Sequence, residues 1–291
     1  MDRPTRYLLF TDLDGALLDH EHYDLEAART TVDALRGRGV ALICNSSKTD
    51  AEIRGYVEEL GLPDPFIAEG GSLLFCPREY FPFRPEGSRE EGEYWVQLLG
   101  RPLEELARAF FEMREALGLP LRAAFEMSDG ELQEATDLPL ERIPLMRARR
   151  ASVPFLCPGP GGEGELAPAR QWALARGLRY ARGSRFHILT GPSDKGEAAA
   201  LLARMYLRVF PRVVTVGVGD NLNDLPLLRE VDHPIAIPTK SGVRPELAAV
   251  AGVRLAPAPG PAGWKAAIEA LFRDLGQEIA PPSSLLLGGP R

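Results

Sequence analysis

Short apolar runs alternate with amphipathic segments at the beginning of the chain. The run Tyr7–Thr11 has the length and composition of a buried strand, and residues 24–38 carry apolar side chains at helical spacing. A second apolar run, Val40–Cys44, follows that segment directly. Because a strand, a helix and a strand in this order form a βαβ unit, we expect the two strands to be parallel neighbours.

The same alternation returns in the last third of the chain. Periodicity predicts helices over 198–206, 224–229 and 262–275, and strands over 213–217, 234–237 and 252–255. Parallel strands need crossover helices, so the two ends of the chain together predict an α/β fold. We expect a Rossmann-like, doubly wound parallel sheet with helices on both faces.

The pattern changes between these two ends. Residues 85–93 are polar and rich in Glu and Gly, as in a linker. Beyond them we expect helices over 103–117, 129–136, 140–149 and 168–176, and strands over 123–127, 178–181 and 186–189. The prediction is a core made of residues 1–84 and 190–291, with residues 85–189 as an inserted α+β domain.

Composition restricts the partners. The formal net charge of the 291 residues is −7, whereas a nucleic-acid or membrane-surface partner would favour a basic face. No apolar run approaches the roughly 20 residues needed to cross a bilayer. Cys44, Cys76 and Cys157 are too widely spaced for a disulfide framework or a zinc site. We therefore expect a cytoplasmic protein with a small-molecule partner, in an oligomeric state that the sequence does not specify.

Two carboxylates one residue apart follow the first strand. Asp12 and Asp14 precede Gly15, a residue suited to a sharp turn. Ligands bind at the carboxyl ends of strands in open α/β sheets, and two close carboxylates repel each other unless a cation lies between them. The pair therefore predicts a Mg²⁺ site with oxygen ligands. The structural alternative is a solvated turn, which Asp and Gly also favour.

Small hydroxyl groups and a lysine follow the second strand. Ser46, Ser47 and Lys48 lead into a predicted helix, so their donors lie at a helix N-terminus, where anions bind. Thr49 can serve as a plain helix cap at the same place, and this role is compatible with phosphate binding. The segment is a candidate phosphate loop.

Two further polar clusters belong to the last third of the chain. Lys195 precedes an apolar helix, and the polar run Gly219–Asp224 follows the strand predicted over 213–217. Because parallel strands end at one edge of the sheet, all four polar clusters can meet there. Together they supply acids for a metal, donors for an anion, a lysine and a spare carboxylate.

These clusters resemble the four ordered motifs of the haloacid dehalogenase superfamily of phosphatases. The motifs are Asp12–Gly15, Ser46, Lys195 and Gly219–Asp224. The resemblance covers essentially the whole chain, and Ala16 is a departure at a position where the family most often has Thr or Val. It implies the fold of that superfamily, with the inserted segment as a type IIB (C2B) cap that closes over the site.

The resemblance also implies a mechanism. Asp12 attacks phosphorus and forms an aspartyl-phosphate, while Asp14 is the general acid and base. Ser46 and Lys195 hold the phosphoryl oxygens. The implied Mg²⁺ ligands are Asp12, Asp14 through its backbone carbonyl, Asp220 and Asp224. Asp224 and Asn221 are alternatively expected to orient Lys195 or the waters on the metal.

Further stretches narrow the resemblance to the mannosyl-3-phosphoglycerate phosphatase family. They are Cys44–Thr49, Ala68–Gly71, Thr136–Pro139, Arg150–Ser152 and Arg185–His187. The implied reaction converts 2-O-mannosyl-3-phosphoglycerate to mannosylglycerate, a compatible solute. The implied substrate-binding residues are Ser47, Lys48, Glu69, Gly70, Gly71, Arg150, Arg185 and Asn221. Gly70 replaces the usual Asn of the family, which leaves the sugar open.

Several alternatives remain at this point. Another sugar phosphate, such as glucosyl-3-phosphoglycerate, sucrose phosphate or trehalose phosphate, would suit the same motifs, and a phosphomutase shares the fold. A non-catalytic phosphosugar-binding protein would not need four intact motifs. Lys48, Arg150 and Arg185 are candidates for the substrate carboxylate, although pairing with Asp on the cap surface explains either arginine nearly as well. His187 is expected to be a packed strand residue.

Overall fold

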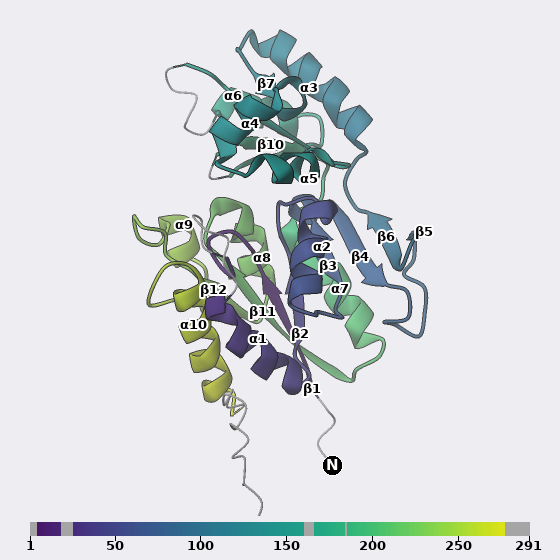
Figure 1. Cartoon of the computed structure of the whole chain (residues 1–291), viewed down its shortest axis with the longest axis vertical. Coiled ribbons are helices and arrows are strands. Elements are labelled where there is room, and N and C mark those ends of the chain that lie inside the picture. The colour runs from purple at the N-terminus through teal and green to yellow at the C-terminus, as the bar shows by residue number, and fades with distance from the viewer. Residues whose placement is uncertain (1–4, 19–25, 160–165, 184, 277–291) are drawn as a thin grey trace, which may run out of the picture.

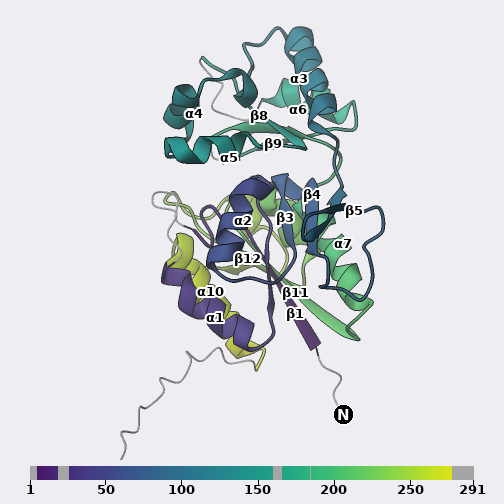
Figure 2. The same cartoon turned by 45° about the vertical axis from the view of Figure 1, so that its right-hand side comes forward.

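The computed structural model describes residues 5–18, 26–159, 166–183 and 185–276. A larger α/β core and a smaller cap are stacked along the long axis, and the chain leaves the core after residue 98 and returns to it after residue 190 (Figures 1 and 2). The expected α/β core with an inserted α+β domain is confirmed. No helix in these described parts of the chain combines the length and apolarity needed to cross a bilayer.

A five-stranded parallel sheet forms the centre of the core, in the order β13-β12-β11-β1-β2. Its strands are β1 (Thr5–Thr11), β2 (Ala41–Cys44), β11 (Arg212–Gly219), β12 (His233–Ala236) and β13 (Arg254–Leu255). β1 links strands from both ends of the chain, because it pairs with β11 on one side and with β2 on the other. Because these strands are parallel, the loops that follow them, from the first and last thirds of the sequence, lie together at the carboxyl edge of the sheet.

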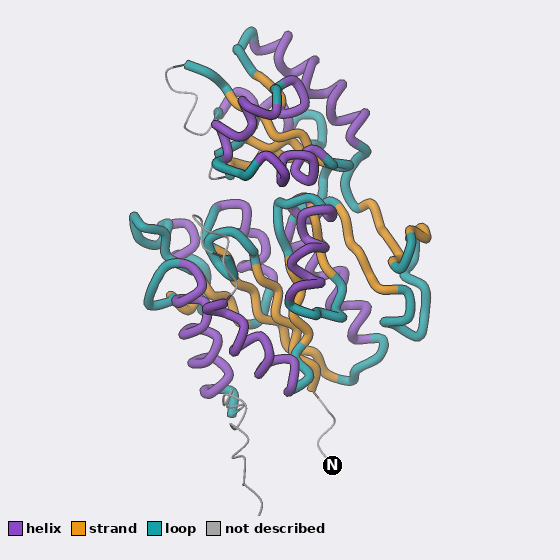
Figure 3. Tube along the Cα trace, viewed as in Figure 1, coloured by secondary structure: helices purple, strands orange, loops and turns teal. Residues whose placement is uncertain are grey.

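Helices cover both faces of this sheet (Figure 3). They are α1 (Glu26–Gly37), α2 (Asp50–Glu59), α7 (Lys195–Leu207), α8 (Leu225–Glu230), α9 (Pro245–Ala248) and α10 (Gly260–Asp274). Successive side chains of β1 point to opposite faces of the sheet and so belong to two apolar clusters. Leu9 packs with α1 and α10 on one face, and Leu8 and Phe10 pack with α7 on the other. Residues 24 and 25, at the beginning of the segment with helical spacing, lie outside the described residues.

A second, antiparallel sheet adjoins the core sheet in the order β3-β4-β6-β5. Its strands are β3 (Phe66–Ala68), β4 (Leu73–Pro77), β5 (Arg89–Glu91) and β6 (Tyr94–Leu98). The linker expected over 85–93 is therefore wrong in part, since β5 is an exposed edge strand whose polar side chains show no alternation. The boundary of the inserted domain at residue 85 stays a prediction, and the pairing of β6 with β4 favours a later one, after Leu98.

The cap contains a four-stranded antiparallel sheet in the order β7-β8-β10-β9. Its elements are β7 (Arg122–Ala123), β8 (Ser152–Leu156), β9 (Arg179–Arg182), β10 (His187–Thr190), α3 (Leu103–Leu117), α4 (Asp129–Thr136), α5 (Ile143–Arg147) and α6 (Ala167–Leu174). The sequence did not predict β8, because Pro154 disfavours a central strand. Burial of Val153 and Phe155 in the cap core outweighs this local preference.

Candidate active site

Lys195 connects two aspartates at the carboxyl edge of the core sheet. Its Nζ lies 2.9 Å from Asp12 Oδ2 and 2.6 Å from Asp224 Oδ1. Asp12 follows β1, Lys195 begins α7, and Asp224 follows β11, so three elements distant in sequence meet at this point. All three side chains are buried, which makes their mutual neutralisation necessary.

Asp224 is fixed by hydrogen bonds as well as by charge. Its Oδ2 accepts from the backbone N–H groups of Asp220 and Asn221, each at 3.1 Å, while its Oδ1 contacts Lys195. A Cβ atom on Gly219 would lie 2.3 Å from Asp224 Cγ, so only glycine allows this close approach. The conformation of the 219–224 turn thus depends on the buried Asp224 carboxylate.

Three buried carboxylates can hold a metal ion. Asp12, Asp220 and Asp224 each offer an oxygen, and these atoms lie within 4.8 Å of one another. Carboxylate oxygens are the ligands that Mg²⁺ prefers, and the cluster carries more negative charge than Lys195 neutralises. The donor set therefore fits the expected ion.

The charges of this cluster shift one another's pKa values. Burial, together with repulsion by Asp224, raises the pKa of Asp12 to about 7, although Lys195 acts in the opposite direction. Burial alone lowers the pKa of Lys195, but the carboxylates of Asp12 and Asp224 raise it above its ordinary value. Lys195 is consequently a permanent cation here, and a bound cation would favour the ionised form of Asp12.

Asp14 makes a separate ion pair beside this cluster. Its Oδ2 lies 2.9 Å from Lys48 Nζ, and its Oδ1 is buried without a hydrogen-bond partner in the described structure. Lys48 also lies 3.9 Å from Glu52 Oε1. Burial lowers the pKa of Lys48, but Asp14 and Glu52 outweigh this and raise it. The orphan oxygen of Asp14 marks a polar group with capacity for a further ligand.

The segment Ser46–Lys48 follows β2 and leads into α2, as the sequence predicted. Ser46 is buried, and its Oγ accepts from the backbone N–H of Lys48 at 3.3 Å. Thr49 caps α2 in a capping box with Glu52, so the structural role weighed for Thr49 is present. Ser47 Oγ receives a hydrogen bond from Asn223 Nδ2 at 3.0 Å, which ties this segment to the 219–224 turn.

Two adjoining cavities lie between core and cap. One of about 140 Å³ contains the reactive groups Asp12, Asp14 and Ser46. A larger one of about 370 Å³ extends along β9 of the cap. Ser47, Asn223 and Ile188 line both, so the two spaces are neighbours. Core side chains supply the charge, and the cap closes the opposite wall.

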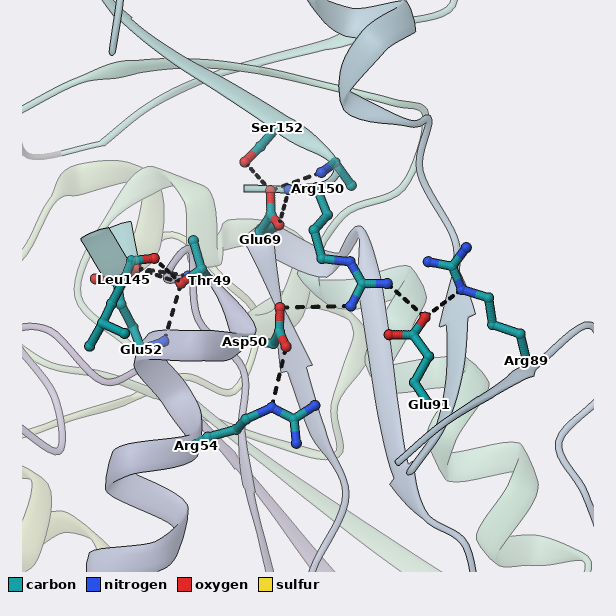
Figure 4. A network of polar contacts seen from close by, with 11 residues as sticks. Thr49, Asp50, Glu52, Arg54, Glu69, Arg89, Glu91, Leu145, Arg150 and Ser152 are labelled. Carbon is teal, nitrogen blue, oxygen red and sulfur yellow. Dashed lines mark hydrogen bonds and ion pairs between the residues drawn. The ribbon is translucent and has the colours of Figure 1, made fainter. Parts of the chain in front are cut away.

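The residues predicted to bind substrate are divided between several places. The small cavity is lined by Ser47, Lys48, Arg185 and Asn221, and the large one by Ser47, Glu69 and Gly70. Arg185 also pairs with Asp137 at 2.7 Å. Arg150 lines neither cavity, and its guanidinium pairs with Glu91 and Asp50 (Figure 4). Gly71 packs against the backbone of Asp194.

Two residues that line the reactive cavity had no site role in the sequence analysis, although Asn223 belongs to the fourth motif. Arg149 and Asn223 both project into it, and each keeps a buried polar atom without a hydrogen-bond partner in the described structure. In the sequence, Arg147, Arg149 and Arg150 form a basic cluster of the kind that solvated helix faces carry. The position of Arg149 directly before the polar Arg150–Ser152 stretch was the available signal.

Known proteins support the resemblance found in the motifs. Residues 9–80 match the family described as haloacid dehalogenase-like hydrolase. A glucosyl-3-phosphoglycerate/mannosyl-3-phosphoglycerate phosphatase of Methanococcoides burtonii is 33% identical over 265 residues, covering 90% of this chain and 96% of the relative. A mannosyl-3-phosphoglycerate phosphatase of Pyrococcus furiosus is 38% identical over 231 residues, covering 79% and 90%.

Solved structures share the fold at lower sequence identity. A sugar phosphatase of subclass IIB superposes with a TM-score of 0.64 at 15% identity and covers 93% of this chain and 99% of that one. The sucrose-phosphatase of Synechocystis superposes with a TM-score of 0.60 at 15% identity, covering 94% and 99%. The chain therefore has the fold of these proteins over nearly its whole length.

Proposed function

The chain belongs to the haloacid dehalogenase-like hydrolases, and we propose that it is a Mg²⁺-dependent phosphatase that converts 2-O-mannosyl-3-phosphoglycerate to mannosylglycerate. The observation that carries this proposal is the buried Asp12–Lys195–Asp224 cluster, which lies in one cavity with Asp14 and Ser46. Relatives at 33% and 38% identity bear the names of mannosyl-3-phosphoglycerate phosphatases.

Asp12 is the nucleophile in this proposal. Its Oδ1 accepts from the N–H of Leu13 at 2.8 Å and its Oδ2 contacts Lys195, so the carboxylate is held in one orientation at the strand end. A fixed carboxylate reaches phosphorus without reorganisation, which lowers the barrier to forming an aspartyl-phosphate. Lys195 then balances the charge that develops on the phosphoryl oxygens.

Asp14 is the proton carrier. It lines the same cavity as Asp12, and its Oδ1 has no hydrogen-bond partner in the described structure, so this is the oxygen left for an ester bound there. In its protonated form Asp14 gives its proton to the leaving alkoxide, and the carboxylate left behind then takes a proton from the water that cleaves the acyl phosphate, which restores the acid. Lys48, at 2.9 Å from the other oxygen, fixes the orientation of the carboxylate through both steps.

The metal ion neutralises phosphoryl charge when bound. Asp12 and Asp220 offer carboxylate oxygens for it, and we expect the Asp14 carbonyl to complete the protein ligands. Both Asp224 oxygens already hold Lys195 and the 219–224 turn. This favours Asp224 as the residue that orients Lys195, rather than as a direct ligand.

The leaving group extends into the larger cavity in this proposal. A space of about 140 Å³ is below the roughly 300 Å³ at which small-molecule sites begin, whereas the adjoining 370 Å³ lies within that range. Phosphate and glycerate would occupy the reactive cavity and the hexose the larger one. Glucosyl-3-phosphoglycerate is a second candidate substrate, because the Methanococcoides burtonii relative carries both sugars in its name.

Phosphate release from a panel of esters tests the proposal. We expect Mg²⁺-dependent release from mannosyl- and glucosyl-3-phosphoglycerate to exceed release from sucrose, trehalose and mannose phosphates. Phosphate that moves within the substrate instead of appearing in solution would indicate a phosphomutase. Asp12→Asn should reduce release below detection, and turnover that survives this change would contradict the mechanism.

A further inference from the structure

The carboxylate of Glu69 is buried where the core meets the cap. Its Oε1 accepts from the backbone N–H of Arg150 at 2.8 Å, and its Oε2 accepts from the N–H of Ala151 at 3.0 Å and from the hydroxyl of Ser152 (Figure 4). Glu69 is only 1% exposed, so these hydrogen bonds replace its hydration. One core side chain thus fixes the beginning of β8, a central strand of the cap.

The backbone of the same turn holds the phosphate loop. The N–H of Gly70 donates to the carbonyl of Ser46 at 2.9 Å, and the N–H of Glu69 donates to the carbonyl of Lys48 at 2.9 Å. These bonds orient two of the three peptide groups in the segment Ser46–Lys48. Glu69 therefore contacts the loop with its backbone and the cap with its side chain.

The third carbonyl of the loop receives its hydrogen bond from the cap. Arg149 Nη1 lies 3.0 Å from the carbonyl oxygen of Ser47 and 3.0 Å from Ser152 Oγ. The Ser152 hydroxyl accepts a hydrogen bond from Arg149 and donates its own hydrogen to Glu69. A hydroxyl group can make both bonds at once. A continuous chain of contacts, Glu69–Ser152–Arg149–Ser47, links the cap to the loop.

The backbone conformation of Glu69 indicates that its side chain is required. Its φ of +50° lies in the left-handed region, which glutamate adopts at a cost of about 1–3 kcal/mol. Glycine would adopt it freely, and glycine occupies the next two positions. A carboxylate kept at a strained position, with every oxygen bound to the cap, points to a functional role for those bonds.

We propose that Glu69 is a positioning residue that couples the seating of the cap to the conformation of the phosphate loop, through Ser152 and Arg149, and not a ligand of the sugar. The inference rests on the proposed function only in that residues 46–48 bind the phosphoryl group. Docking of β8 on Glu69 places Arg149 on the Ser47 carbonyl, and this aligns the loop donors for phosphate.

Kinetics of Glu69→Gln with Mg²⁺ present test this coupling. The amide keeps the size of the side chain but presents N–H groups to donors, so the contacts with β8 weaken. We expect kcat to fall about tenfold or more for both mannosyl-3-phosphoglycerate and p-nitrophenyl phosphate, because the loop is misplaced for either ester. The inhibition constant of inorganic phosphate should rise about fivefold or more. Ser152→Ala should move the same constants in the same direction by a smaller factor.

Glu91→Gln is the matched control. Glu91 also binds the cap from the core, through Arg150 at 2.8 Å, but its side chain is half-buried, lines neither cavity and makes no hydrogen bond or ion pair with residues 46–48 in the described structure. Its kinetic constants should stay within about twofold of the wild type, because a half-buried ion pair away from the phosphate loop contributes little to the reaction. A comparable loss in Glu91→Gln would show that any weakened cap contact has this effect, and would overturn a specific role for Glu69.

Two further results would contradict the proposal. A higher KM for the sugar ester alone, with p-nitrophenyl phosphate kinetics and phosphate inhibition unchanged, would make Glu69 a sugar ligand. A lower melting temperature with all kinetic constants unchanged would make it purely structural. If the wild type fails to hydrolyse mannosyl-3-phosphoglycerate, the proposed function fails, while p-nitrophenyl phosphate and inorganic phosphate still report on Glu69.

Discussion

At the scale of single residues, the buried charges at the carboxyl edge of the core sheet are stabilised by neighbouring charges of opposite sign. Lys195 is fully buried between Asp12 and Asp224, whereas Lys265 on α10 is 41% exposed and lies 3.7 Å from Glu269. Removal of one partner from a buried group of charges leaves an uncompensated charge, but removal of an exposed lysine does not. We therefore expect Lys195 to contribute to the stability and the activity of the protein, and Lys265 to contribute little to either.

We expect Lys195→Met to be inactive and unstable. Loss of the charge that balances phosphoryl oxygens should lower kcat at least about 100-fold. The unpaired aspartates should lower the free energy of unfolding of the metal-free protein by about 3–5 kcal/mol. Urea denaturation measures the second effect, with Lys265→Met as the control, expected within about 0.5 kcal/mol of the wild type. Equal stability of both variants would contradict the burial argument.

The raised pKa of Asp12 predicts how Mg²⁺ binding depends on pH. With a pKa of about 7, metal-free Asp12 is protonated below neutrality and must release its proton to bind the ion. The affinity for Mg²⁺ should therefore fall about tenfold for each pH unit below 7 and level off above it. Calorimetric titration from pH 5.5 to 8.5 measures this slope. Affinity that is constant below pH 7 would show that Asp12 is already ionised without metal.

At the scale of elements, the two linkers between core and cap pass each other at glycines. A Cβ atom on Gly191 would lie 2.5 Å from the backbone nitrogen of Arg101, so the backbones of the linkers are in direct contact. By contrast, a Cβ atom on Gly130 in α4 meets no atom within 4 Å. The same substitution should thus have opposite effects at the two positions.

Gly191→Ala should destabilise the protein, and Gly130→Ala should stabilise it. Steric overlap between linkers is expected to cost about 1–3 kcal/mol, as for other overpacked sites. Alanine in a helix reduces the entropy of the unfolded chain and is worth about 0.4–1 kcal/mol. Melting temperatures of the two variants should lie on opposite sides of the wild type. A stabilising Gly191→Ala would mean that the linkers are not packed as described.

At the scale of the whole molecule, the cavities exist only because the cap lies on the core. Ile188 of β10 belongs to the cap, and Ser47 and Asn223 belong to the core, yet all three line both spaces. A substrate that fills both must pass these residues. The size of the side chain at position 188 therefore sets access between the reactive cavity and the larger one.

Ile188→Trp should discriminate between large and small substrates. The larger side chain narrows the passage, so kcat/KM for mannosyl-3-phosphoglycerate should fall about tenfold or more, a change of about 1.4 kcal/mol. For p-nitrophenyl phosphate the fall should stay below about threefold. Steady-state kinetics with both esters measures the ratio. Equal losses for the two would place the sugar outside the larger cavity.

The sequence by itself determined the local pieces and the chemical groups. Apolar periodicity located β1, β2, α3, α4 and α10 closely, because their burial patterns repeat over several residues. The polar run after β1 identified Asp12 and Asp14, because ligands bind at the carboxyl ends of strands in a parallel sheet. Lys195 was identified by its place before an apolar helix, although the strand that precedes it, β10, belongs to the antiparallel sheet of the cap. The sequence did not predict β8 or the polar edge strand β5, whose local signals oppose their structure.

Only the tertiary structure decided which long side chains reach the site. Arg149 and Arg150 are neighbours in sequence, yet one lines the reactive cavity and the other pairs with Asp50 and Glu91 outside it. Glu69 likewise binds β8, which lies about 80 residues further along the chain. Charge type and position can be read locally, but the direction of a side chain depends on contacts between segments that only folding brings together.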